Sequence, residues 1–157
     1  MEFLKTIGEK VNKLLIEEWE LQGHKMNESK FERELEAEVY SEGNTKGVRG
    51  LGVGYARFVN QGVSKSQIKY PYAKARIEGL TKYVLNRMGI GGAQGVSIAF
   101  AIANKHKKEG MPTDSSKKYS KTGKRTEFIE EAFKKGEKEI DEIVEGELSN
   151  YVVSILP

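Results

Sequence analysis

Apolar residues recur every three or four positions at the start of this chain, which is the spacing of a helix with one buried face. Between residues 2 and 22 this stripe consists of Phe3, Leu4, Ile7, Val11, Leu14, Leu15 and Trp19. Gly23 follows the stripe, and glycine readily ends a helix because it adopts left-handed backbone conformations. Other elements have to cover a stripe this broad, so the sequence predicts a fold built around a packed N-terminal helix.

The same spacing predicts three more helices. One starts near Pro71 and runs to Met88, where the glycine-rich segment MGIGGAQG ends it. A shorter, alanine-rich helix follows around residues 96–103, and we expect these two helices to form a hairpin. An acidic amphipathic helix is predicted from Phe128 to Val144.

Alternation of apolar and polar residues indicates a small sheet. Residues 31–41 alternate in this way, as expected for a strand with one face in water. We expect residues 34–40 to pair with residues 53–59 across a long, exposed, glycine-rich hairpin loop, and residues 151–156 to form a terminal strand. The sequence therefore predicts an α+β fold. In it, a small antiparallel sheet with a long hairpin loop packs against the N-terminal helix, the helical hairpin and the C-terminal amphipathic helix.

Length and composition suit one folded domain, which we expect to span residues 1–157. The chain is 38% hydrophobic and 31% charged, which is apolar enough for a core. The absence of cysteine excludes disulfides and thiolate metal sites. No apolar run approaches the roughly 18 residues of a membrane span, so we expect a cytosolic product with no membrane partner.

The residues that most often carry catalysis do not converge in the sequence. His24 and His106 are the only histidines, lie far apart and are predicted to be exposed. The glycine cluster of residues 89–94 has Gln where a dinucleotide-binding loop needs its third glycine, and it lacks the ending of a phosphate-binding loop. The glutamates of residues 34–38 lie on a solvated strand face, whereas a catalytic pair needs one desolvated carboxyl. We expect no enzymatic activity, no cofactor and no metal site.

Charge is unevenly distributed along the last third of the chain. Residues 105–125 hold eight basic and two acidic residues, a net charge of +6, and residues 126–147 hold three basic and nine acidic residues, a net charge of −6. Residues 107–125 are almost free of apolar side chains, which predicts a mobile Lys-rich loop. Three interpretations stay open: a solvated linker, a segment that docks on an acidic protein, or a nucleic-acid contact in which Tyr119 stacks on a base.

Three short sequence blocks resemble, in order, segments of the neck or tail-completion proteins of long-tailed bacteriophages. The first, residues 54–63, reads GYARFVNQGV, with Val63 in place of the usual threonine. The second, residues 98–113, reads IAFAIANKHKKEGMPT, and the third, residues 128–133, reads FIEEAF. The Lys-rich stretch between the last two blocks looks like an insertion.

The resemblance implies an α+β subunit of a homo-oligomeric ring without enzymatic activity. Before assembly, such a subunit is expected in the host cytoplasm. In the virion, the ring lies in the neck, between the portal or adaptor proteins and the tail tube or tail terminator protein. The leading interpretation is therefore a structural virion protein. The alternative is a nucleic-acid-binding module that uses the basic 105–125 loop, and a third class is a small toxin or nuclease.

Two sets of basic residues are the candidate contact sites. A ring subunit needs two different faces that fit one another, and oppositely charged segments provide them. The docking candidates, expected to contact acidic groups on a neighbouring chain, are Lys117, Lys118, Lys121, Lys124 and Arg125. We also expect Lys46 and Arg49, in the glycine-rich loop of residues 43–52, to face the central channel and contact DNA non-specifically.

Overall fold

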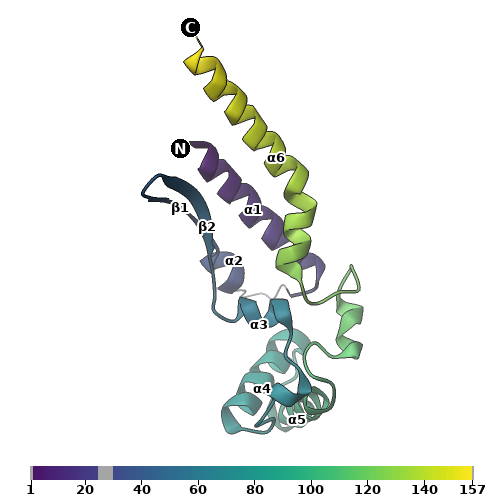
Figure 1. Ribbon diagram of the computed structural model, residues 1–157. Helices are drawn as coiled ribbons and strands as arrows, with labels where there is room; N and C mark the ends of the chain where they lie inside the picture. The colour runs from purple at the N-terminus through teal and green to yellow at the C-terminus, as the bar shows by residue number, and fades with distance from the viewer. Residues whose placement is uncertain (1, 25–29, 157) are drawn as a thin grey trace. The chain divides into compact units, whose positions relative to one another are not determined.

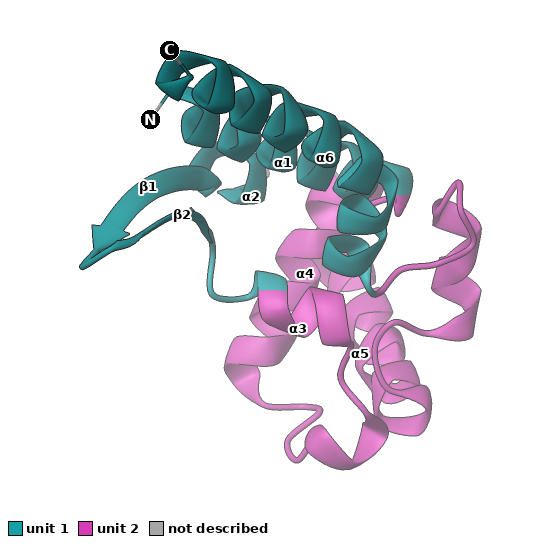
Figure 2. Cartoon of the chain, turned by 45° about the horizontal axis from the view of Figure 1, so that its top comes forward, with its two compact units in different colours: residues 1–21, 30–56, 127–157 teal, residues 22–29, 57–126 magenta. Residues whose placement is uncertain are grey.

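The computed structural model describes residues 2–24 and 30–156. Their contacts group the chain into two compact units (Figure 2). Unit 1 takes its described residues from 2–21, 30–56 and 127–156, and unit 2 from 22–24 and 57–126. Helices dominate beside one two-stranded antiparallel sheet, which confirms the α+β class (Figure 1).

Unit 1 is built on two antiparallel helices that lie side by side, α1 (Glu2–Leu21) and α6 (Phe128–Ile155) (Figure 1). The amphipathic stripe of residues 2–22 forms α1 as predicted. Ion pairs join Lys10 to Glu139 and Glu18 to Lys135, and Gly136 lies against the side chain of Leu14. Partners across the helix pair thus have residue numbers that add up to about 150, and glycine lets the two backbones approach closely.

An aromatic cluster fills the core of unit 1 where these helices meet the short helix α2 (Lys30–Glu34). The rings of Trp19 and Phe31 stack with centroids 4.2 Å apart. The ring of Phe128 meets both edge-on, with centroids 5.1 Å from Trp19 and 5.4 Å from Phe31. Stacked and edge-to-face geometries are the favoured ones for aromatic pairs, so this cluster holds the two long helices and α2 together.

The sheet is a tight hairpin, and its observed pairing corrects the prediction. Strand β1 (Glu36–Glu42) pairs with β2 (Thr45–Leu51) through a two-residue turn, in which Gly43 has φ 60°. A left-handed φ at the first turn residue suits glycine and matches the twist of paired strands. The supposed long loop is thus mostly strand β2. The glycines of β2 concealed its strand character, and the ring of Tyr40 covers one of them, Gly47.

The segment predicted as the second strand is not a strand. Residues 53–59 pass through a turn into helix α3 (Ala56–Gln61). The alternation at the start of β1 is real, since Glu36 and Glu38 are exposed and the alternate residues Ala37 and Val39 are partly buried. The prediction failed at the partner strand because β2 and the 53–59 segment compete for the same pairing edge, and the shorter connection closes the smaller loop.

Unit 2 contains the predicted helical hairpin, α4 (Lys74–Met88) and α5 (Gly92–Glu109). Gly89 ends α4 with φ 70°, the left-handed conformation expected after a helix. Ile77, Ala99 and Ala103 form the buried core between the two helices, with Leu80 packed against them. Contrary to the prediction, α5 is the longer helix, with 18 residues against 15. Two short 3-10 helices, η1 (Lys65–Gln67) and η2 (Asp114–Tyr119), complete the unit.

Helix α6 continues far beyond the predicted end at Val144. It has 28 residues and runs to Ile155, so the predicted terminal strand of residues 151–156 is wrong. The β-branched residues of YVVSIL favour a strand only where a partner strand is present. Here the helix is already formed, and each added residue gains one backbone hydrogen bond by extending it.

Candidate assembly surfaces

The first two sequence blocks of the phage resemblance contact each other in unit 2. Val63, at the end of the first block, and Met111, in the second, exchange two backbone hydrogen bonds of 2.7 Å. Gly62 and Gly110 flank this bridge with φ 72° and 88°. A side chain on Gly110 would place its Cβ atom 2.6 Å from the Val63 carbonyl oxygen. Gly62 and Gly110 thus have a structural reason: they let two backbone segments meet.

The third block begins at the core of unit 1. Phe128 is fully buried in the aromatic cluster, and Ala132 is buried one turn later. Glu127 precedes them with φ 60°, an uncommon conformation for a residue with a side chain, and its carbonyl accepts the first helical hydrogen bond, from Glu131. The block therefore marks the place where the chain turns sharply into α6.

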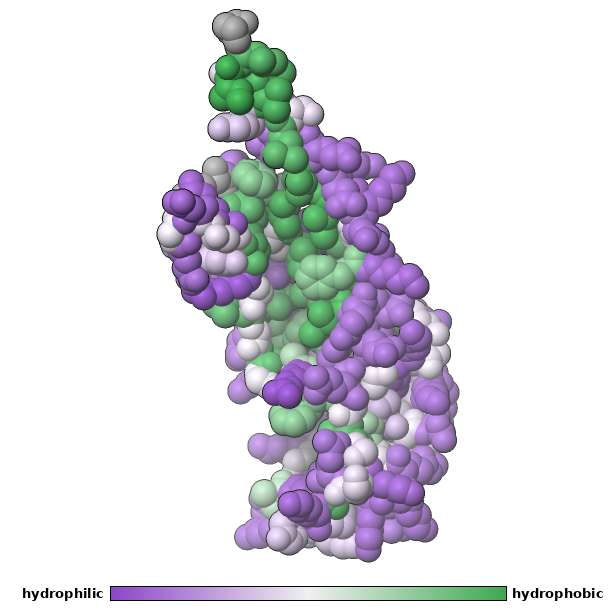
Figure 3. Space-filling view, viewed as in Figure 1, coloured by the Kyte–Doolittle hydropathy of each residue, from purple (hydrophilic) through white to green (hydrophobic). Residues whose placement is uncertain are grey.

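The end of α6 has a large exposed apolar surface. Its register with α1 places the first residue of α1, Glu2, opposite about residue 148, so the last two turns of α6 extend beyond α1. Figure 3 shows hydrophobic side chains gathered at the end of this helix, at the top of the view. We call this end of α6 the α6 arm. Its exposed apolar residues are Leu148, Tyr151, Val152, Val153, Ile155 and Leu156.

A second apolar surface lies between the two helices of unit 2. A groove of about 1000 Å³ runs along α4 and the first half of α5. Its apolar lining includes Tyr72, Ile77, Leu85, Val96 and Phe100. All of these except Ile77 are substantially exposed, and the rings of Tyr72 and Phe100 stack at 6.2 Å. Because Gly79, Gly91 and Gly92 also line the groove, few side chains fill it. We call it the α4–α5 groove.

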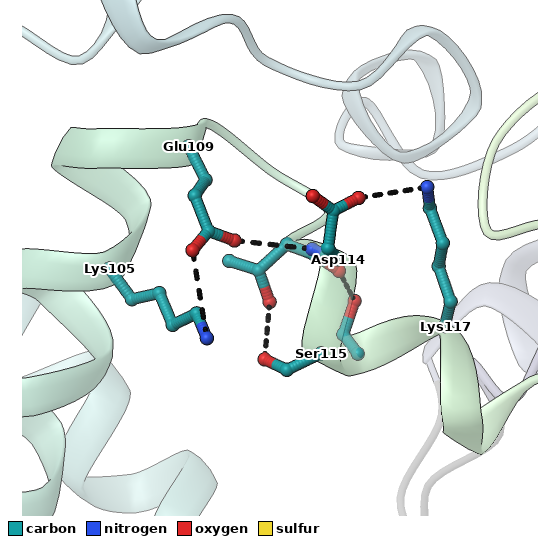
Figure 4. Close-up of polar contacts among 7 residues, drawn as sticks. Lys105, Glu109, Asp114, Ser115 and Lys117 are labelled. Carbon is teal, nitrogen blue, oxygen red and sulfur yellow. Dashed lines mark hydrogen bonds and ion pairs between the residues drawn. The ribbon is translucent and has the colours of Figure 1, made fainter.

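The basic segment of residues 107–125 has a defined backbone, which includes the end of α5 and all of η2. Its two acidic residues, Glu109 at the end of α5 and Asp114 at the start of η2, each pair with a nearby lysine (Figure 4). The Glu109 carboxylate lies 3.6 Å from the Lys105 ammonium and accepts a hydrogen bond from the backbone N–H of Asp114. The Asp114 carboxylate accepts a hydrogen bond of 2.9 Å from the ammonium of Lys117. These contacts neutralise part of the local charge. The mobility of this segment stays a prediction.

The five docking candidates occupy different environments. Lys118 lies over the ring of Tyr119, with the ammonium 5.1 Å from its centroid, and Lys121 and Lys124 are exposed. Lys117 is exposed too, although it is paired with Asp114. Arg125 instead turns inward, where its guanidinium donates to the carbonyl oxygens of Ser116 at 3.2 Å and Gly23 at 3.4 Å. Arg125 thus joins segments of unit 2 rather than presenting its charge outward.

Lys46 and Arg49, the channel candidates, both lie on β2. Lys46 is exposed close to the hairpin turn, opposite Ser41. Arg49 donates a hydrogen bond of 3.0 Å to the carboxylate of Glu38 across the strands, and it lies over the ring of Tyr40. Lys46 is exposed beside the turn, whereas Arg49 is held against Glu38 and Tyr40 on the strands, so of the two Lys46 better matches a projecting loop tip.

Both histidines are partly buried in unit 2, which corrects the prediction that they are exposed. Burial, followed by the positive charge of Arg125, lowers the pKa of His24 to about 4. Burial, followed by the positive charge of Arg76, lowers the pKa of His106 to about 4. The Arg76 guanidinium lies 3.1 Å from Nδ1 of His106 and donates to it. Each histidine is thus a neutral acceptor for an arginine, and the two belong to separate clusters.

Two absences hold for residues 2–24 and 30–156, which the structure describes. No group of three or more His, Asp or Glu side chains in this described part is arranged to hold a metal ion. Within the same residues, no helix combines the length and apolar character needed to cross a membrane. Comparison with protein families, with characterised proteins and with solved structures finds no match to this chain.

The sequence pointed to charged segments as contact surfaces and missed the two apolar ones. Alternation predicts a strand for residues 151–156 of the α6 arm, although Leu148, Tyr151, Val152 and Ile155 have helical spacing in the sequence. The α4–α5 groove had no such signal, because its apolar residues also fit a helix stripe buried in a core. Only the packing of α4 against α5 shows which of them stay exposed.

Proposed function

We propose that this chain is a structural subunit of a tailed bacteriophage, which assembles into an oligomeric ring in the neck and joins the portal or adaptor complex to the tail. The observation that carries the proposal is the α6 arm. The end of α6, with Leu156 just after the helix, presents six apolar side chains to solvent, each with at least 48% of its surface exposed. Contiguous apolar patches of this kind mark sites where a protein binds another surface.

The sequence resemblance gives this assembly surface a biological setting. Its first two blocks form one bridged structure in unit 2, and its third block starts the helix that ends in the arm. The first two blocks, which are far apart in sequence, therefore form one local structure, and the third block begins another. This supports reading the three blocks as parts of one fold rather than as chance similarities.

Separate surfaces are available for the expected partners. A subunit within a ring contacts its two neighbours and also the proteins above and below the ring. The arm and the groove are apolar, while Lys118 and Lys121 present charge on the basic segment. We assign the apolar surfaces to permanent subunit contacts, which are typically the more hydrophobic ones. The basic segment is assigned to acidic groups of the portal, adaptor, tail tube or tail terminator protein.

Native mass spectrometry of the purified chain, alone and mixed with tail-tube protein, tests this function. A closed ring of one defined copy number, or a ring that forms on the tail tube, is the expected result. A chain that stays monomeric in both samples over a wide concentration range contradicts the proposal.

The same preparation tests the alternative function, a nucleic-acid-binding module. Phosphate neutralisation makes such binding fall steeply with salt concentration. A gel-shift titration at several salt concentrations is therefore informative. Tight, strongly salt-dependent binding by a monomeric chain favours the alternative. The pairing of Lys117 with Asp114 and the inward position of Arg125 reduce the charge available for it.

A further inference from the structure

The α6 arm and the α4–α5 groove are two apolar surfaces of one chain with matching character. We propose that the α6 arm of one copy inserts into the α4–α5 groove of a second copy, so that the subunits join head to tail. This inference rests on the proposed ring assembly and adds the contact that builds it. It commits to a second copy of this chain as the occupant of the groove.

The arm has the side-chain spacing of a helix that binds in a groove. Leu148, Tyr151, Val152 and Ile155 occupy positions i, i+3, i+4 and i+7 of one helix face. This is the anchor pattern with which amphipathic helices enter hydrophobic grooves. The face is 48% exposed at Val152, its least exposed anchor, and no described segment of unit 1 covers it. The anchors are thus ready for a partner outside their own unit.

The groove offers a surface of the same chemistry. Leu85, Val96 and Phe100 line it with 39–50% of their surface in solvent. Glycines take the place of larger side chains at the wall, and a Cβ atom built on Gly79 would meet no atom within 4 Å. An entering helix therefore finds open space above an apolar floor. Burying apolar surface on both sides stabilises such a contact by roughly 25 cal/mol per Å², before the cost of association.

Charges at the edges of the two surfaces are complementary. Lys74 and Lys82 lie at the groove with one acidic residue, Glu78, which pairs with Lys74 at 3.9 Å, so these three residues carry a net charge of +1. The turn of α6 before the arm carries Glu145 and Glu147, both exposed. An arm lying in the groove thus brings an acidic segment toward a net basic rim. Complementary rim charges of this kind fix orientation and speed association more than they add affinity.

The two surfaces differ, which determines the kind of assembly. A contact between different patches leaves one arm and one groove unused in every dimer. Further copies then add until the chain of contacts closes on itself as a ring. An arm that paired with another arm would instead stop at a two-fold dimer. Head-to-tail insertion is therefore the arrangement that accords with a ring.

Charge substitutions on each surface, measured by native mass spectrometry, test the contact. Val152→Glu on the arm and Phe100→Glu in the groove should each weaken self-association at least about tenfold. Asn150→Glu, at an exposed polar position on the opposite face of α6, and Met88→Glu, on α4 outside the groove lining, are matched controls and should assemble normally. Gly79→Leu fills the groove without adding charge and should also block assembly. Circular dichroism and the unfolding temperature establish that each variant is folded.

Mixing the two defective variants gives the sharpest result. A Val152→Glu copy keeps its groove, and a Phe100→Glu copy keeps its arm, so the mixture should form heterodimers and no rings. If Phe100→Glu still forms rings, or if each variant alone forms dimers, head-to-tail insertion is wrong while a ring-forming function survives. A wild-type chain that is monomeric alone and with tail-tube protein overturns both proposals.

The absence of cysteine allows a direct test by crosslinking. Copies with Val152→Cys and copies with Phe100→Cys should form a disulfide-linked heterodimer when mixed under mild oxidation. Asn150→Cys, on the opposite face of α6, mixed with Phe100→Cys is the control and should crosslink much less. Equal crosslinking in both mixtures overturns the proposal. A third sample, a chain that carries both Val152→Cys and Phe100→Cys, tests for contact within one copy. A disulfide that forms only within such single chains also overturns the proposal.

Discussion

Val63 and Met111 exchange a pair of 2.7 Å backbone hydrogen bonds across 48 residues of chain, and a glycine precedes each of them. Both glycines have left-handed φ values, and both face a backbone carbonyl of the opposite segment. Gly62 lies against the carbonyl of Met111, and Gly110 against the carbonyl of Val63. The bridge therefore depends on two residues without side chains.

Gly110→Ala should destabilise unit 2 by about 2 kcal/mol or more, because it combines a disfavoured φ with a Cβ atom only 2.6 Å from a carbonyl oxygen. Gly123→Ala is the matched control, since Gly123 has a similar φ of 75° and open space around it. It should cost only about 1 kcal/mol. Chemical denaturation of both variants measures the difference, and equal losses would mean that the close approach is unimportant.

Gly136 and Gly146 provide a comparison within α6. Alanine at an exposed mid-helix glycine stabilises by about 0.5–1 kcal/mol, and Gly146→Ala should do so, because no atom lies within 4 Å of its Cβ position. Gly136→Ala should instead destabilise, since its Cβ atom would lie 2.2 Å from a methyl group of Leu14. Thermal unfolding gives the sign for each. In a Leu14→Ala background the Gly136→Ala penalty should shrink or reverse, and an unchanged penalty would contradict the close helix contact.

The sequence predicted the helices well because their burial pattern is local. The stripe from Phe3 to Trp19 and the Gly89 stop depend on neighbouring residues alone. Pairing partners are different, because a strand such as β2 is specified by what lies across from it. Gly47 reads as a loop residue until the Tyr40 ring is seen to cover it. Exposure is also non-local, which explains why neither the α6 arm nor the partial burial of His106 was predicted.

The glutamate Glu18 is 2% exposed in unit 1 and pairs with Lys135 of α6. Lys135→Met keeps the aliphatic stem but removes the ammonium, so it should destabilise the fold by about 1–3 kcal/mol. Adding Glu18→Gln to the same chain should recover part of this loss, because the buried negative charge is then absent. Urea denaturation of the single and double variants measures the coupling. Additive losses in the double variant would show that the pair does not act as a unit.

The lowered pKa values of His24 and His106 predict acid sensitivity. Each pKa lies near 4 in the folded chain and near 6.5 in the unfolded chain, so the unfolded state binds more protons between these values. Stability should therefore be fully present above about pH 6.5 and should fall as the pH drops toward 4. The unfolding temperature measured from pH 7 to 4.5 checks this. His106→Gln should flatten the slope, and a slope unaffected by changing both histidines would contradict the prediction.

The inward position of Arg125 separates it from the lysines with which the sequence groups it. Arg125→Ala should lower stability by about 1–3 kcal/mol, because the carbonyl oxygens of Ser116 and Gly23 lose a charged donor. Lys118→Glu with Lys121→Glu should leave stability within about 0.5 kcal/mol, because both side chains are exposed. Although its stability is unchanged, this double variant should bind an acidic neck or tail partner more weakly, and that binding should depend less on salt concentration. Thermal unfolding and affinity at several salt concentrations measure the two effects. If the lysine variant binds its partner unchanged at every salt concentration, the basic segment is a solvated surface and the apolar arm and groove carry the assembly.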